Sequence, residues 1–128
     1  VKYIGPVGPE ARGDLLAGAR ALLHLIDFEE PFGYSVVEAM ACGTPVIANA
    51  RGSMSEIVRH GEGGYLVHSP DEAVAAVRAL GDLDRLAVRA SVERRFDVDR
   101  MVDQYLDVYR GVLAQRRAGR TRLEADSG

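Results

Sequence analysis

The sequence has a single cysteine, Cys42, and no long apolar run. One cysteine cannot form an intrachain disulfide or a thiolate metal cluster, so nothing indicates an oxidising compartment. Apolar runs such as 21–26 are far shorter than the roughly 20 residues of a membrane-spanning helix, and residues 1–13 lack the apolar core of a signal peptide. We therefore expect a soluble protein located in the cytoplasm.

Basic charge is not in excess either, because 16 Lys and Arg stand against 19 Asp and Glu, a net charge of -3. This mildly acidic balance argues against nucleic acid as a general partner. Arginine almost to the exclusion of lysine, together with abundant alanine, indicates a GC-rich bacterial genome. With 47% apolar residues among 128, the chain can form one hydrophobic core but not two.

Short β-rich runs alternate with segments of helical pattern, which predicts an α/β fold with a parallel sheet. The runs are 1–4, 21–26 and 45–48, and residues 65–67 favour a fourth strand. They are apolar throughout, as expected where flanking helices cover both faces of a parallel sheet.

The second half of the chain is predicted to be helical. Residues 73–80 and 83–90 favour two amphipathic helices, and seven apolar or aromatic residues between Val98 and Val112 share one helical stripe. A stripe of this size exceeds what a small sheet needs, so we expect it to seek a partner. The arginine-rich segment 116–128 is predicted to be a flexible tail after a domain of residues 1–115, although clustered arginines also suit contact with phosphate.

The segment 27–50 carries the candidate chemistry, because it follows a predicted strand. Ligands of open parallel sheets bind beyond the carboxyl ends of the strands. A helix predicted to begin at Tyr34 presents unpaired N–H groups and the positive end of its dipole, which together bind phosphate. Gly33 has no Cβ, so a ligand can approach this backbone closely.

Two glutamates flank this predicted helix start. Glu38, about one turn inside the helix, points back toward its beginning and suits the hydroxyl groups of a ribose. Glu30, at the strand end, suits sugar hydroxyls or the stabilisation of positive charge at an anomeric carbon. Two glutamates near a helix start are also explained as favourable partners of the helix dipole. Their spacing alone leaves both interpretations open.

The chain resembles the family 4 retaining glycosyltransferases of the GT-B fold in the stretch EPFGYSVVEAMACGTPVIA, residues 30–48. That family carries two glutamates separated by seven residues at this point. The similarity continues at Gly52, residues 56–58, Gly61 and Gly64. It implies part of a Rossmann-like C-terminal domain, followed by C-terminal helices.

The resemblance also implies roles for individual residues. Glu30 would be the catalytic residue near the reacting centre of the transferred sugar, and Glu38 would bind the nucleotide ribose. The sugar hydroxyls and the diphosphate would be held by backbone N–H groups of Phe32, Gly33, Tyr34 and Ser35. The base would be bordered by the loop of Gly5, Pro6 and Val7. Transfer from the nucleotide-diphosphate sugar donor would proceed with retention, without a metal ion and without a cofactor.

The chain departs from the family pattern at several places. It has Ile26–Asp27 where many members carry Pro–Ser, and Gly52–Ser53 where many carry Gly–Gly. Residues 53–56 also fit a capping box for a following helix. The basic pair that grips the diphosphate precedes this segment in the family and has no counterpart in the 128 residues, and the same holds for the acceptor domain.

We therefore expect a donor-binding portion that is inactive alone and is completed by a missing N-terminal acceptor domain or a partner subunit. An uncovered sheet edge favours a homo-oligomer. The alternative is a non-catalytic nucleotide-sugar-binding or regulatory module. The acceptor is not identified by this sequence, because acceptor contacts lie mainly in the missing domain.

The remaining reactive side chains favour structural roles. His24 lies in an apolar run and is predicted to be a hydrogen-bonded core histidine, while His60 and His68 lack the spacing of metal ligands. Cys42 precedes Gly43, a residue suited to ending a helix, and is predicted to be a packing residue.

Overall fold

The computed structural model describes residues 1–125, and the surroundings of side chains up to residue 116. The chain divides into two compact units, Val1–Arg94 and a second unit beginning at Arg95. Each is described by itself.

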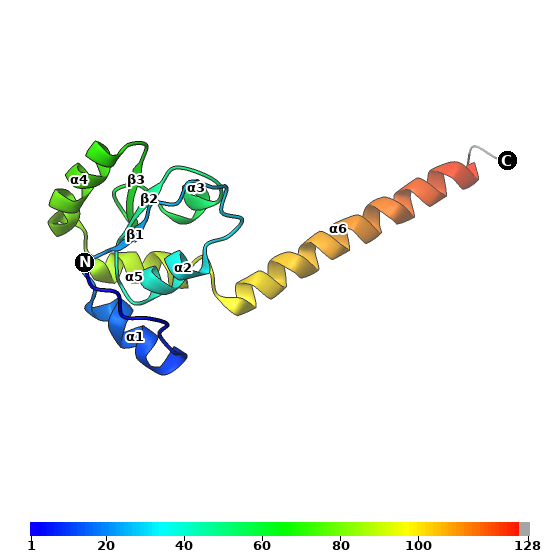
Figure 1. Cartoon of the computed structure of the whole chain (residues 1–128). Coiled ribbons are helices and arrows are strands. Elements are labelled where there is room, and N and C mark those ends of the chain that lie inside the picture. Colours follow the sequence, from blue (N-terminus) through cyan, green and yellow to red (C-terminus); the bar gives the residue numbers. More distant parts are fainter. Residues whose placement is uncertain (126–128) are drawn as a thin grey trace. The chain divides into compact units, whose positions relative to one another are not determined.

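The first unit is built on a parallel sheet, as predicted (Figure 1). Its strands lie in the order β1 (Leu22–His24), β2 (Val46–Asn49) and β3 (Gly64–Val67), with Leu22 opposite Val46 and Val46 opposite Gly64. Strand β2 is central, and its first three residues are fully buried. All three carboxyl ends therefore meet at one edge of the sheet.

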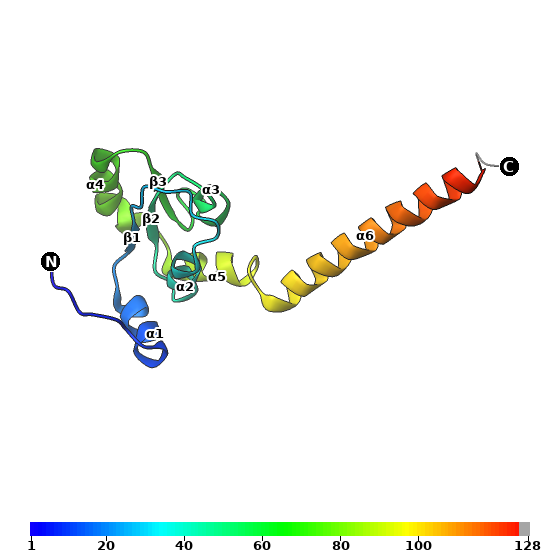
Figure 2. The same ribbon diagram turned by 45° about the vertical axis from the view of Figure 1, so that its right-hand side comes forward.

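Helices cover both sides of this sheet, and those after residue 33 lie near the predicted positions. In the first unit the helical elements are α1 (Pro9–Gly18), α2 (Tyr34–Ala41), α3 (Met54–Ile57), α4 (Pro70–Ala79), the 3₁₀ turn η1 (Leu80–Asp82) and α5 (Arg85–Glu93). Helix α4 packs on β2 and β3, whereas α2 packs on β1 and β2 with α5 outside it. Figures 1 and 2 show α4 and α2 on opposite sides of the sheet. Ile47 and Val67 form a buried cluster with Ala73 and Ala76 of α4.

The predicted strand at residues 1–4 is wrong. These residues form no strand, and Tyr3 is 87% exposed. An apolar run becomes a strand only where a neighbouring strand pairs with its N–H and C=O groups, and the structure describes no such neighbour for this segment. For the same reason β1 is an edge strand.

Coverage of the sheet is also incomplete at β1, contrary to the prediction that helices cover both faces throughout. Leu23 is 57% exposed and Leu25 is 43% exposed, because α4 lies mainly over β2 and β3. The described part of the chain thus leaves both an unpaired strand edge and apolar surface beside it.

The second unit contains helix α6 (Val98–Ala125), which confirms the helix predicted from the stripe. The rings of Tyr105 and Tyr109 on this stripe have centroids 6.4 Å apart. The predicted boundary at residue 116 does not coincide with a helix end, because α6 continues to Ala125; residues 126–128 lie outside the described residues. Among the described residues, no helix is long and apolar enough to cross a bilayer.

Candidate functional site

Helix α2 follows the loop after β1 and begins at Tyr34, directly after Gly33, which has φ +88°. The positive φ favours glycine at this position, whereas a Cβ here would lie 2.6 Å from Cε of Met54, the flexible end of a side chain that can shift. The Gly33 carbonyl accepts hydrogen bonds from the N–H groups of Val36 and Val37 at 3.0 and 3.2 Å. These bonds fix the first turn of the helix.

Three successive N–H groups at this helix start have no hydrogen-bond partner within the described residues. They belong to Gly33, Tyr34 and Ser35. They lie at the positive end of the α2 dipole. A bound anion would accept hydrogen bonds from these donors in place of water. Unpartnered N–H groups at a helix N-terminus are what an anion needs, and the binding of an anion here stays a prediction.

Two aromatic rings stand beside these N–H groups. The rings of Phe32 and Tyr34 have centroids 4.8 Å apart, and Tyr34 is 75% exposed. Exposed aromatic rings beside unpartnered N–H groups provide apolar surface of the kind against which a sugar or a base packs.

Glu30 lies close to this helix start. Its Cγ is 3.5 Å from the position that a Gly33 Cβ would occupy, and the residue is half-buried. The loop between β2 and α3 fixes its backbone, because the Ser53 N–H donates to the Glu30 carbonyl at 2.9 Å. The structure thus brings the predicted catalytic residue and the predicted diphosphate-binding residues together.

Glu38 lies in the second turn of α2, with its side chain turned to a neighbour that the sequence did not indicate. One carboxylate oxygen is 3.4 Å from the guanidinium of Arg12 in α1. Both side chains are more than a third exposed, so this ion pair contributes at most about 1 kcal/mol to stability. It nevertheless holds the carboxylate on the side of α2 that faces α1.

The loop of Gly5, Pro6 and Val7 lies immediately before α1, and Gly5 and Val7 are half-buried. No hydrogen bond or ion pair joins this loop to α2 in the part of the chain that the structure describes. The contact of this loop with a base stays a prediction.

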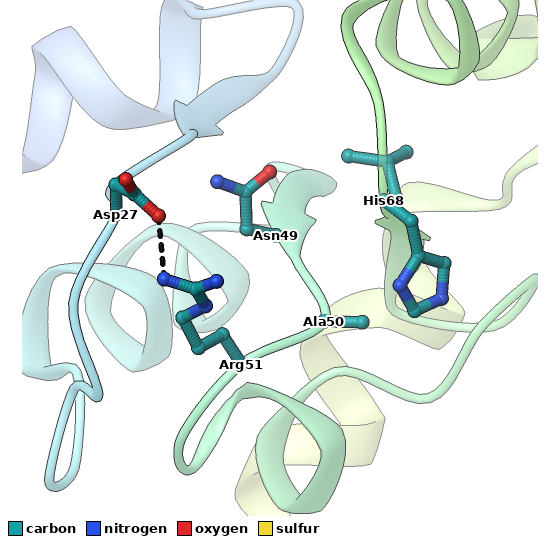
Figure 3. Close-up of a pocket in the computed structure, with 6 residues that line it drawn as sticks. Asp27, Asn49, Ala50, Arg51 and His68 are labelled. Carbon is teal, nitrogen blue, oxygen red and sulfur yellow. Dashed lines mark hydrogen bonds and ion pairs between the residues drawn. The ribbon is translucent and has the colours of Figure 1, made fainter.

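A second group of polar residues at the strand ends was missed by the sequence reasoning. Together with two apolar neighbours it borders an open pocket of about 190 Å³, lined by Asp27, Asn49, Ala50, Arg51, Val67 and His68 (Figure 3). Figure 3 shows the guanidinium of Arg51 directed at Asp27, with which it forms a hydrogen-bonded ion pair. The available signal was the polar residue that follows each of three predicted strand runs, Asp27 after 21–26, Asn49 after 45–48 and His68 after 65–67.

Two predictions about single residues are wrong. The Ser53 side chain forms no capping hydrogen bond with α3, because Ser53 already has helical φ and ψ and its hydroxyl donates to the Phe32 carbonyl at 2.9 Å. His24 is not a hydrogen-bonded core residue, since its buried Nε2 has no partner in the described structure; it lies on the edge strand, where no polar group reaches it. Cys42 is half-buried at the end of α2, and the N–H of Gly43 closes that end on the Met40 carbonyl at 2.8 Å, as predicted.

A parallel sheet with a helix N-terminus at the carboxyl end of one strand defines a Rossmann-like ligand-binding domain of the α/β class. Residues 1–92 match the family model described as "Glycosyl transferases group 1". The chain belongs to this family, as its resemblance to the family 4 enzymes indicated.

Similar proteins agree with this assignment. A D-inositol 3-phosphate glycosyltransferase of Nocardioides sp. is 36% identical over 124 residues, which are 91% of this chain and 27% of that protein. The chain thus spans about a quarter of the length of the curated relatives it matches, and it matches their C-terminal portion.

Solved structures show the same domain. AviGT4, a glycosyltransferase involved in avilamycin A biosynthesis, has a TM-score of 0.72 and 35% identity, over 90% of this chain and 36% of that one. HepE of Anabaena, in complex with UDP and glucose, has a TM-score of 0.72 and 28% identity, over 87% of this chain and 32% of that one. The predicted fold, part of the C-terminal domain of a GT-B glycosyltransferase, is confirmed.

Proposed function

We propose that this chain is the donor-binding portion of a retaining glycosyltransferase and that it holds a nucleotide-diphosphate sugar at the N-terminus of α2. The observation that carries this proposal is the row of three unpartnered N–H groups at Gly33, Tyr34 and Ser35. A diphosphate fits them because it supplies the negative charge and the acceptor oxygens that this helix end lacks. The complexes of HepE with UDP and with UDP-glucose support a nucleotide-sugar donor.

The chemistry follows from what lies around these N–H groups. During transfer, negative charge grows on the diphosphate as the bond to the sugar breaks, and preorganised N–H donors stabilise that charge more in the transition state than in the ground state. The helix N-terminus would stabilise the negative charge of the leaving diphosphate, as a metal ion does in other enzymes, so we propose that transfer needs no divalent metal.

Glu30 is proposed to act on the sugar. Its side chain lies over Gly33, so a sugar attached to a diphosphate on the same N–H groups would lie within reach of its carboxylate. A carboxylate at this place stabilises the positive charge that develops at the anomeric carbon.

The ribose and the base are proposed to lie toward α1. Glu38 faces α1 through its ion pair with Arg12, and the loop of residues 5–7 immediately precedes that helix. A carboxylate held in place by an arginine is preorganised to accept hydrogen bonds from two neighbouring ribose hydroxyls.

Transfer itself is proposed to need an acceptor domain or partner subunit that meets this face. Holding donor and acceptor together supplies several kcal/mol of barrier lowering, roughly 7 to 11 in favourable cases. We propose that the stripe of α6 packs against that domain and that residues 1–128 alone bind nucleotide without transferring sugar.

The experiment that tests this function is a titration of the ¹⁵N-labelled chain with UDP, followed by amide chemical shifts. The largest shifts are expected at Gly33, Tyr34 and Ser35, with uridine binding much more weakly because it lacks the diphosphate. The same dissociation constant is expected in EDTA and in Mg²⁺, and no glucose is expected to be released from UDP-glucose. Shifts that spare residues 30–38, or UDP binding that is abolished by EDTA and restored by Mg²⁺, would refute the proposed site.

A further inference from the structure

Two loops that are about twenty residues apart in sequence are joined by hydrogen bonds and an ion pair next to the site. The strand-end loop, residues 27–33, carries Glu30 and Gly33, and the clasp loop, residues 51–53, follows β2. Arg51 pairs with Asp27, and the Gly52 N–H donates to Oε2 of Glu29 at 2.6 Å. These two contacts hold the first half of the strand-end loop.

Ser53 holds the second half through two hydrogen bonds. Its N–H donates to the Glu30 carbonyl and its hydroxyl donates to the Phe32 carbonyl, both at 2.9 Å. Ser53 therefore fixes two peptide groups, Glu30–Pro31 and Phe32–Gly33. The first bond belongs to the backbone and exists with any residue except proline, whereas the second depends on the side chain.

The bond to Phe32 sets the direction of a neighbouring donor. The Phe32 carbonyl and the Gly33 N–H belong to one planar peptide, which is trans, so the two groups point in opposite directions. Because the carbonyl is tied to the Ser53 hydroxyl, the Gly33 N–H is turned away from the clasp loop. That N–H is the first of the three unpartnered donors of the site.

We propose that Ser53 is a positioning residue for the donor diphosphate, acting through the Phe32–Gly33 peptide and not by contact with the ligand. The inference rests on the proposed function, because it assigns the Gly33 N–H to the diphosphate. Without the hydroxyl, this peptide can rotate about its neighbouring bonds, and the Gly33 N–H loses its fixed direction. Ligands that accept a hydrogen bond from this N–H are expected to bind more weakly, and ligands that do not use it are expected to keep their affinity.

The test compares Ser53→Ala, Ser53→Thr and Ser55→Ala in the 128-residue chain, with UDP and uridine as the two probes. Ser55 is an exposed serine of α3, the short helix that follows Ser53, and its side chain forms no hydrogen bond in the described structure, so it is the matched control. We expect Ser53→Ala to weaken UDP by about 3- to 10-fold, the effect of one lost hydrogen bond, and to leave uridine unchanged. Ser53→Thr restores the hydroxyl and is expected to restore UDP affinity, and Ser55→Ala is expected to match the parent chain.

The amide signal of Gly33 separates positioning from general loosening of the fold. In the chain without ligand, Ser53→Ala is expected to shift this signal and to speed its hydrogen exchange, while amides of β2 and α5 keep their parent positions. Equal losses for UDP and uridine, or a loss that threonine does not restore, would overturn the role of Ser53. Unchanged UDP affinity in Ser53→Ala, with a parent chain that binds UDP at Gly33, would also overturn the role of Ser53. The proposed function would stand in that case. If the parent chain fails to bind UDP, the proposed function fails and the positioning role fails with it.

Discussion

Replacement of Glu30 by Gln is expected to lower the turnover of an active glycosyltransferase containing this chain by about 100- to 1000-fold, the usual cost of removing one preorganised charge-stabilising group. UDP affinity is expected to change little. Cγ of Glu30 lies 3.5 Å from the position of a Gly33 Cβ, and we propose that its carboxylate acts on the positive charge that develops on the sugar. Its effect is therefore expected in the transition state and not in the ground state.

Glu38→Ala is expected to do the reverse. Loss of the carboxylate that Arg12 holds would remove the proposed ribose contact, which is shared by the ground and transition states. We therefore expect a higher KM for the donor with a smaller change in kcat. Steady-state kinetics with the donor varied measures both effects. Glu10→Gln is the control for lost charge, because Glu10 is exposed in the first turn of α1 and has no ion pair in the described structure. Equal and small effects at Glu30 and Glu38 would contradict the division of roles.

Gly52→Ala is expected to disrupt the site by displacing the backbone of Glu30. Gly52 has φ +56°, and a Cβ there would lie 2.6 Å from both N and O of Glu30, which are backbone atoms and cannot give way without moving the strand-end loop. We expect the free energy of unfolding to fall by more than the roughly 1–2 kcal/mol that a left-handed alanine costs by itself, and UDP affinity to fall at least about 10-fold as Glu30 and Gly33 are displaced.

Gly61→Ala is the matched control for this variant. Gly61 also has positive φ, +80°, but nothing lies within 4 Å of its added Cβ. It carries the same backbone strain without the clash, so it is expected to lose stability while binding UDP like the parent chain. Urea unfolding and UDP titration of both variants make the comparison. Identical behaviour of the two variants would show that Gly52 matters only for its φ and not for its contact with Glu30.

What could be predicted from this sequence is what depends on residues close together along the chain. The start of α2 at Tyr34, its end shortly before Gly43 and strand β2 follow from one continuous stretch of sequence. The order of residues in this stretch sets the helix and its unpaired N–H groups. The core of the candidate site is local in the same way, because Glu30 and Gly33 are three residues apart.

The contacts that were missed all join distant segments. Arg12 and Glu38 are 26 residues apart, and the hydroxyl of Ser53 reaches a carbonyl 21 residues earlier. Short-range patterns favoured a helix cap at Ser53 and gave Arg51 no partner. Neither pattern contains the tertiary packing that brings the clasp loop against the strand-end loop. The expected strand at residues 1–4 failed for a related reason, since pairing depends on a neighbour and not on the run itself.

The central claim is the place of the diphosphate, and a crystal structure of the chain with UDP-glucose tests it most directly. The strand ends offer two sites, the N–H groups of Gly33, Tyr34 and Ser35, and the open pocket beside Arg51 and His68 (Figure 3). We predict that phosphate oxygens lie within hydrogen-bond distance of the three N–H groups, with the glucose beside Glu30. A diphosphate bound in the open pocket by Arg51, with the start of α2 left to solvent, would contradict the account.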